Sequence, residues 1–232
     1  MKKLTFGLLI MCGLSPLFSF AQLRVAPTFG INFATAQLSD EAKEALAPID
    51  ESYKNKLITS FQIGAIGEYA LNDVLSLQSG LILNGKGTHL KASLSAFGVT
   101  LESANKVRLT YLSLPLTAKY YLMETDGFLL SGWGGLVLDF AVAGKIKNVT
   151  QVGDEKETNT ETISFGSSTN DDLKGSDVSL TLGVTADSQD LPLQLKFALV
   201  QGLINAFPYD EGEYSWRNFG INLSAAYFFE LD

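Results

Sequence analysis

The chain has very few of the residues that carry most of the chemistry in proteins. Its 232 residues include one cysteine, Cys12, and one histidine, His89. A single cysteine excludes a disulfide within the chain and a zinc site built from several cysteines. Only 18% of the residues are charged, and the formal net charge is −8. This acidic balance gives no overall electrostatic case for binding nucleic acid or phosphate ligands.

Long apolar runs are also missing, except at the N-terminus. Lys2 and Lys3 precede an apolar stretch that ends in Ser19-Phe20-Ala21, with small residues at the −3 and −1 positions of a signal-peptidase site. We therefore expect a signal peptide over residues 1–21 and a mature domain over residues 22–232. Cleavage removes two lysines and no acid, which takes the net charge from −8 to −10.

Two other interpretations of the leader are disfavoured by its flanking residues. An uncleaved membrane anchor would be followed by a basic stop-transfer cluster, and none follows Gln22. A lipoprotein would need a small residue before Cys12, where Met11 stands. The mature chain is then expected to contain no thiol.

Alternation with a period of two residues dominates the remainder of the chain. In residues 61–71, for example, Phe61, Ile63 and Tyr69 occupy one face, whereas Gln62 and Glu68 occupy the other. Eight segments show this pattern, the first of them weakly: residues 23–33, 61–71, 75–84, 112–122, 128–140, 177–185, 191–199 and 219–229. The pattern predicts an all-β fold with eight strands.

The predicted connections alternate between short and long. Residues 72–73, 123–127 and 188–190 form short turns, whereas 34–56, 91–105, 146–176 and 202–217 are predicted to be long polar loops, the first with a short helix between Ser39 and Pro48. Outer-membrane barrels have this rhythm, with short turns and both termini in the periplasm. We therefore predict an eight-stranded antiparallel transmembrane β-barrel in the cell outer membrane, preceded by a cleaved signal peptide.

Alternation alone does not say which face meets lipid. In a soluble, lipocalin-like carrier of an apolar ligand the apolar face would point inward, whereas in a membrane barrel it points outward. Here the polar face is rich in Gly, Ser, Thr, Asn and Gln and lacks the dense Lys and Glu of a solvated exterior. Aromatic residues such as Tyr120 and Tyr227 stand near the strand ends, as in an interfacial girdle. Both features favour the membrane barrel.

Glu68, Lys119, Asp139 and Lys196 then point into the lumen, where we expect a structural polar network. Two acids and two bases neutralise one another in an interior where an unpaired charge is unfavourable. Counting from the short turns predicts similar heights for all four, with Lys119 and Asp139 as the best-placed pair. An eight-stranded barrel is just wide enough for its own side chains, so we expect no open pore.

Two blocks of the sequence resemble the PorT-like outer-membrane β-barrel family of the Bacteroidetes. The first runs from Ser60-Phe61-Gln62 through Glu68-Tyr69 to Lys86-Gly87, and the second is the Tyr-Leu-x-x-Pro-Leu-x-x-Lys-Tyr-Tyr block at residues 111–121. The resemblance implies a porin-like barrel of the cell envelope. The sequence departs from the family pattern at two places. Ser113 stands where Glu is common, and Glu230-Leu231-Asp232 follow Phe229, whereas such chains often end on an aromatic residue.

Three classes of function remain open. The first is a barrel with a structural or surface-interaction role, surrounded by outer-membrane lipid and contacting a surface or envelope protein through its acidic loops. The second is the soluble carrier, and a distant third is a lipid-modifying enzyme, for which His89 with Ser93 and Ser95 lacks an orienting acid. The acidic segments 154–157 and 171–172 lack the ligand order of a calcium loop. We therefore expect no catalytic residue, cofactor or metal site, and no nucleic-acid partner.

Overall fold

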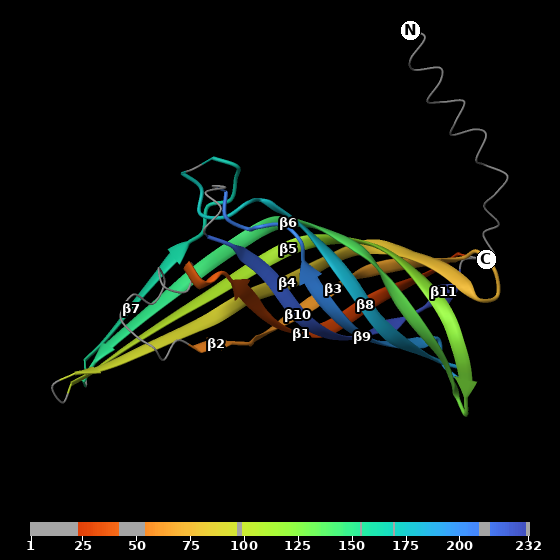
Figure 1. Cartoon of the computed structure of the whole chain (residues 1–232). Coiled ribbons are helices and arrows are strands. Elements are labelled where there is room, and N and C mark those ends of the chain that lie inside the picture. Colours follow the sequence, from red (N-terminus) through yellow and green to blue (C-terminus); the bar gives the residue numbers. More distant parts are fainter. Residues whose placement is uncertain are drawn as a thin grey trace, which may run out of the picture.

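Eight antiparallel strands close into a barrel in the computed structural model, which describes residues 23–41, 54–96, 99–153, 155–168, 170–208 and 214–230 (Figure 1). Around the ring they are β1 (Leu23–Leu38), β3 (Ile58–Ala70), β4 (Leu75–Ala96), β5 (Val99–Thr125), β6 (Phe128–Val152), β8 (Ser176–Ser188), β9 (Leu193–Gly202) and β10 (Trp216–Tyr227). Pairing of β10 with β1, from Thr28↔Ala226 to Leu38↔Trp216, completes the ring. The predicted eight-stranded barrel is confirmed.

Three short strands lie outside this ring. Strand β2 (Lys54–Lys56) pairs with β4, β7 (Glu155–Thr162) pairs with β6, and β11 (Phe229–Glu230) pairs with the start of β1. The described residues contain no helix long and apolar enough to cross a membrane. The expected signal peptide at residues 1–21 lies outside the described residues, as does most of the short helix expected after Ser39, of which only Asp40 and Glu41 are described as helical.

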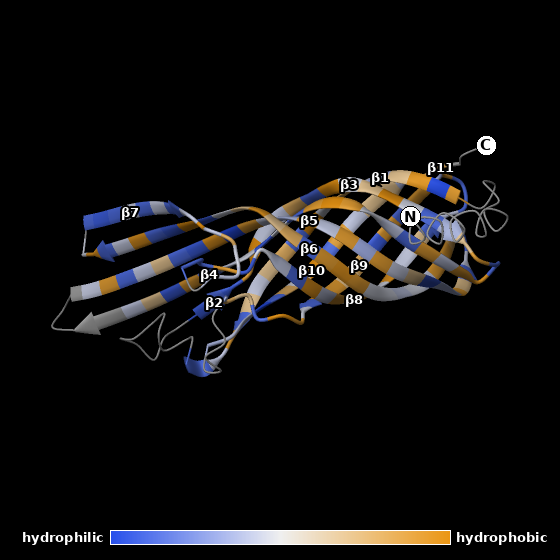
Figure 2. Cartoon of the chain, turned by 90° about the horizontal axis from the view of Figure 1, so that it is seen from above, coloured by the Kyte–Doolittle hydropathy of each residue, from blue (hydrophilic) through white to orange (hydrophobic). Residues whose placement is uncertain are grey.

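The alternation of the sequence sets the two faces of the barrel wall. On β4, Leu77, Leu81 and Leu83 are 46–57% exposed, whereas Gln78 between them is 4% exposed. Every strand of the ring has exposed large apolar side chains and buried Gln, Asn, Ser, Thr or charged side chains. The two kinds of residue alternate along the strands in the hydropathy colours of Figure 2. An apolar exterior around a polar interior is the arrangement of a membrane barrel, and it does not favour the lipocalin-like carrier.

Short turns join the strands at one end of the barrel, as predicted. Between β3 and β4, the side-chain oxygen of Asn72 accepts hydrogen bonds from the backbone N–H groups of Val74 and Leu75. Between β5 and β6, Gly127 has a φ of 87°, which a residue without Cβ adopts at little cost. We call this the short-turn end, and the opposite end, to which β4, β5 and β6 run on, the long-loop end.

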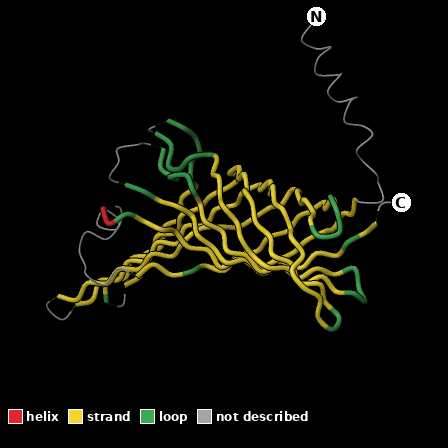
Figure 3. Tube along the Cα trace, turned by 45° about the vertical axis from the view of Figure 1, so that its right-hand side comes forward, coloured by secondary structure: helices red, strands yellow, loops and turns green. Residues whose placement is uncertain are grey.

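Two of the predicted long loops are wrong. Residues 91–105 are mostly strand, because β4 and β5 stay paired to Ala96↔Val99, and residues 146–162 mostly continue β6 and form β7. The paired strands β4, β5, β6 and β7 therefore extend past the barrel as a twisted arm, to the left in Figure 1 and in the tube of Figure 3. Inner positions such as Leu90 and Val107 remain buried where the arm begins, so alternation continues there but with fewer apolar residues.

An apolar cluster lies where the arm, the strand ends and the loops meet. Ile163, Leu173 and Ala206 of the connecting loops are buried against residues of the wall. Its buried members are Ala36, Leu38, Leu90, Val107, Leu109, Tyr111, Ile163, Leu173, Ala206 and Trp216. This cluster is the largest apolar contact region inside the described molecule, and it lies at the long-loop end of the polar lumen.

Candidate functional site

The lumen near the short-turn end holds two acids and two bases from four strands. Oε1 of Glu68 on β3 accepts hydrogen bonds from Nη2 of Arg24 on β1, at 2.7 Å, and from Nζ of Lys119 on β5, at 2.8 Å. Asp187 on β8 faces the same two bases, at 2.9 Å from Arg24 and 3.4 Å from Lys119. We call these four residues the lower cluster. Its charges balance, which a buried group of ions requires.

Two amides extend the lower cluster. Gln194 on β9 donates a hydrogen bond of 2.9 Å to Asp187, and Gln78 on β4 donates a short one to Glu68. The oxygen of Gln78 accepts a hydrogen bond of 2.6 Å from Nζ of Lys196. Nζ of Lys196 also lies 4.0 Å from the ring centroid of Trp133, and no described carboxylate forms an ion pair with it.

A second group of ions lies further toward the long-loop end. Nζ of Lys86 on β4 is 2.6 Å from Oδ2 of Asp139 on β6 and 3.7 Å from Oδ2 of Asp177 on β8. Ser113 donates a short hydrogen bond to Asp139, and Asn218 donates one of 2.9 Å to Asp177. We call Lys86, Asp139 and Asp177 the upper cluster. It has one base for two acids, and Asp139 is fully buried.

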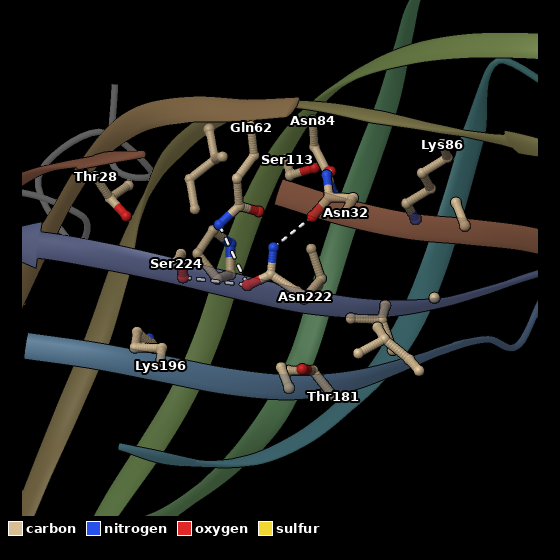
Figure 4. Close-up of a pocket in the computed structure, with 18 of the residues that line it drawn as sticks. Thr28, Asn32, Gln62, Asn84, Lys86, Ser113, Thr181, Lys196, Asn222 and Ser224 are labelled. Carbon is tan, nitrogen blue, oxygen red and sulfur yellow. Dashed lines mark hydrogen bonds between the residues drawn. The ribbon is translucent and has the colours of Figure 1, made fainter. Parts of the chain in front are cut away.

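A cavity of about 90 Å³ lies between the two clusters. Amides of three strands cross it: Asn222 donates a short hydrogen bond to Asn32 and accepts one of 3.4 Å from Gln62 (Figure 4). Lys196, Trp133 and Lys86 also line it. At roughly 10–15 Å³ per water, the cavity has room for several waters.

All four predicted lumen residues point inward, but their predicted arrangement is wrong. Glu68, Lys119 and Lys196 are brought together through Gln78, whereas Asp139 belongs to the upper cluster. On neighbouring strands Lys119 lies opposite Trp133, and Asp139 lies opposite Ser113. Six residues at about 3.3 Å each therefore separate the two along the strand, which excludes the expected Lys119–Asp139 pair.

Half of the inward charges were not predicted from the sequence. These residues share their strand faces with the inward-pointing amides and hydroxyls, so the alternation of the sequence could have placed them inside the barrel. They are Arg24, Lys86, Asp177 and Asp187. Arg24 and Asp187 were missed because they lie close to strand ends. Lys86 lies beyond Asn84, the last residue assigned to its strand. Asp177 was assigned to the polar face of its strand but was not included among the expected lumen charges. The complete inward set has four acids and four bases among the described barrel residues.

The residues considered for catalysis or metal binding are not assembled into such sites. His89 lies on the arm, where burial and then Lys91, Lys106 and Lys56 lower its pKa below the usual value. Asp172 accepts hydrogen bonds from the backbone and hydroxyl of Ser164, and Asp154 lies outside the described residues. In the described segments, no three His, Cys, Asp or Glu residues are grouped to hold a metal ion.

A family model for the outer membrane protein β-barrel domain matches residues 20–208. The chain belongs to that family. It is accordingly a protein of the outer membrane, with the wall of the barrel in lipid and the two ion clusters inside it. No curated protein sequence matches the chain.

Solved outer-membrane barrels are similar to the chain at low sequence identity. Ail, the attachment invasion locus protein of Yersinia pestis, is 10% identical, with a TM-score of 0.38 and coverage of 89% of this chain and 98% of that one. The Neisserial surface protein NspA is 11% identical, with a TM-score of 0.39 and coverage of 90% and 97%. OprG of Pseudomonas aeruginosa is 14% identical, with a TM-score of 0.34 and coverage of 90% and 96%.

Proposed function

We propose that this protein is a closed outer-membrane barrel that acts at the cell surface through its arm, as a structural or interaction protein and not as a pore. The observation that carries the proposal is the filled lumen. The lower cluster crosses the barrel near the short-turn end, the upper cluster crosses it further along, and the apolar cluster lies at the long-loop end.

The proposal places the short-turn end and both termini in the periplasm and the arm outside the cell. Support comes from the lengths of the connections, because short periplasmic turns and long external segments are general in such barrels. The arm is the part available to a partner. Its strand β7 is exposed along its whole length. The partner is expected to be another surface or envelope protein.

The PorT-like subgroup stays part of the proposal, supported by the two sequence blocks. In the fold, Lys119 of the second block joins the lower cluster, and Pro115 lines the cavity. Ser113, the departure from the family, donates its hydroxyl to Asp139. A Glu at this position would bring a third acid to the upper cluster, which has a single base. The expectation that the protein is not an enzyme also stays a prediction.

Conductance tests the closed barrel. Purified protein in planar bilayers should show no steady current, and liposomes containing it should not swell in small sugars. A matched variant, Gln78→Gly with Gln194→Gly, removes two amides that bind the lower cluster and should give a small, measurable leak. A reproducible open channel in the unmodified protein would refute the closed barrel.

Site-specific crosslinking in intact cells tests the surface role. A photoreactive residue at Thr160, exposed on β7, should crosslink to an envelope or surface protein. The control position is Asp73, exposed in the turn between β3 and β4 on the proposed periplasmic side. The orientation is tested with Asp73→Cys and Thr160→Cys variants and an impermeant thiol reagent added to cells. Equal labelling of the two cysteines would overturn the orientation. A lack of crosslinks at Thr160, with the orientation upheld, would overturn the interaction role.

A further inference from the structure

A row of positive charge crosses four neighbouring strands at the base of the arm. Lys56 of β2 lies opposite His89 of β4, His89 lies opposite Lys106 of β5, and Lys106 lies opposite Lys147 of β6. Residues directly opposite one another on paired strands point to the same face of the sheet. The row is therefore a single line of side chains on one face.

Two further rows flank it at a spacing of two residues. Arg108 lies opposite Lys145 on the side of the barrel, and Lys54 lies opposite Lys91 on the side of the arm's tip. The residues between the rows, such as Val107, point to the other face and are buried there. The three rows form one cationic patch about 14 Å wide and 13 Å high, from the spacings of strands and of residues within them.

The patch keeps its charge uncompensated. Throughout the described parts of the chain, none of its seven lysine and arginine residues forms an ion pair, and like charges directly opposite one another destabilise a sheet. Of the described acids on strands β2 and β4–β7, only Glu102 shares this face, four residues from Lys106. Strand β7 turns its glutamates to the opposite face, because Glu161 lies opposite the inward Ile146.

The patch begins where the apolar exterior ends. The last exposed large apolar residues of β5 and β6 before the patch are Leu112 and Val142, which are 37% and 59% exposed. Arg108 follows four residues beyond Leu112, and Lys145 follows three residues beyond Val142. With tilted strands, this places the first row about 10 Å beyond the apolar band, at the level of the polar headgroups.

We propose that this cationic patch binds the phosphorylated headgroup of the glycolipid in the outer leaflet that surrounds the barrel. The position beside the apolar band distinguishes a lipid from a soluble ligand, since acyl chains can lie along the barrel wall below the patch. Three rows at different heights fit a headgroup with anionic groups at more than one level. The inference uses the orientation proposed above but not the closed lumen.

Calorimetric titration with lipid A that carries two phosphates tests this proposal. The protein is folded in zwitterionic micelles free of bacterial lipid, and the double variant Lys106→Gln, Lys147→Gln is compared with it. At about 1 kcal/mol for each lysine beside an anionic surface, the variant should bind about 30-fold more weakly. Dephosphorylated lipid A should bind the unmodified protein about as weakly.

The control variant removes the same charge elsewhere. Lys174→Gln with Arg217→Gln changes two cations outside the patch, one of them on β10 across the barrel from β5. It should bind within about threefold of the unmodified protein, because exposed charges further than a Debye length away are screened. Circular dichroism of each variant checks that the barrel has folded.

Two outcomes would overturn the proposal. Equal losses in the patch and control variants would show that only net charge matters. Tighter binding of a soluble sulfated polysaccharide than of lipid A, lost in the patch variant, would assign the patch to a soluble polyanion. Both outcomes are independent of conductance, so a channel found in bilayers would leave this proposal standing.

Discussion

The upper cluster gives the sharpest test of the structure, because Lys86 is the only base paired with Asp139 among the described residues. Their side chains are 7% and 0% exposed, and Nζ and Oδ2 are 2.6 Å apart. Replacing Lys86 by Met removes the charge and keeps most of the volume. A buried acid left without its base typically lowers the free energy of unfolding by about 3–5 kcal/mol, and we expect a loss in this range.

The complementary change is milder. Asp139→Asn removes one charge, keeps an acceptor for Ser113, and leaves Lys86 with Asp177 at 3.7 Å, so we expect a loss of about 2 kcal/mol. The double variant should lose less than the sum, with a coupling energy of about 2 kcal/mol, because neither partner is then left as an isolated charge. Reversible urea unfolding in lipid vesicles measures all three losses.

A second cycle provides the control. Lys119 and Asp139 belong to different clusters about 20 Å apart along the strand, so Lys119→Met and Asp139→Asn should add within about 0.5 kcal/mol. Additive losses for Lys86 and Asp139, with coupled losses for Lys119 and Asp139, would refute the register of β5 and β6. That result would restore the pairing expected from sequence.

Other substitutions test the wall and the lumen. Leu116→Arg or Leu195→Arg, at sites 48% and 47% exposed on the outer face, should each lower the free energy of unfolding in vesicles by about 2–4 kcal/mol. The control is Thr158→Arg on the arm, which is exposed and lies opposite the uncharged Val149, and it should be neutral; equal effects at all three sites would contradict the membrane face. Lys196→Met should lower stability by less than half as much as Lys119→Met, since Lys196 has an amide and an aromatic ring as partners where Lys119 has two carboxylates, and a larger loss for Lys196 in the same urea assay would refute this ranking.

The barrel was predictable because its signal is local. Each strand buries one face in a narrow polar lumen, so residues two apart repeat their character, and Leu77, Gln78 and Leu81 alone indicate the two faces. Short turns were equally readable at Asn72 and Gly127. The arm was not, because its strands are paired with one another above the barrel and alternation there involves small, polar and charged residues, which also suit a loop.

The pairing within the ion clusters could not be predicted from the sequence. The alternation along each strand was enough to place Glu68, Lys119, Asp139 and Lys196 inside. Which acid meets which base depends instead on the stagger of neighbouring strands. The bulge between Thr110 and Tyr111 on β5, where Val142 is the extra residue of β6, shifts that register again at the long-loop end. No local pattern specifies such offsets, so the partner of Asp139 could not be found without the structure.

Net charge was the most misleading of the sequence observations. It sums charges over the whole chain, whereas strand pairing places the acids and the bases on different faces of the sheet. The interior holds four acids against four bases, and the outer face at the base of the arm holds seven full positive charges beside one glutamate. The acidic excess therefore lies elsewhere, in part on the other face of β7, where Glu155, Glu157 and Glu161 stand. An acidic protein can thus present a phosphate-binding surface where strand pairing gathers its few cations. The alternation of side chains along each strand decides which charges share a face. A one-residue slip of β6 against β5 would therefore turn Lys145 and Lys147 to the opposite face and remove the patch without changing the composition.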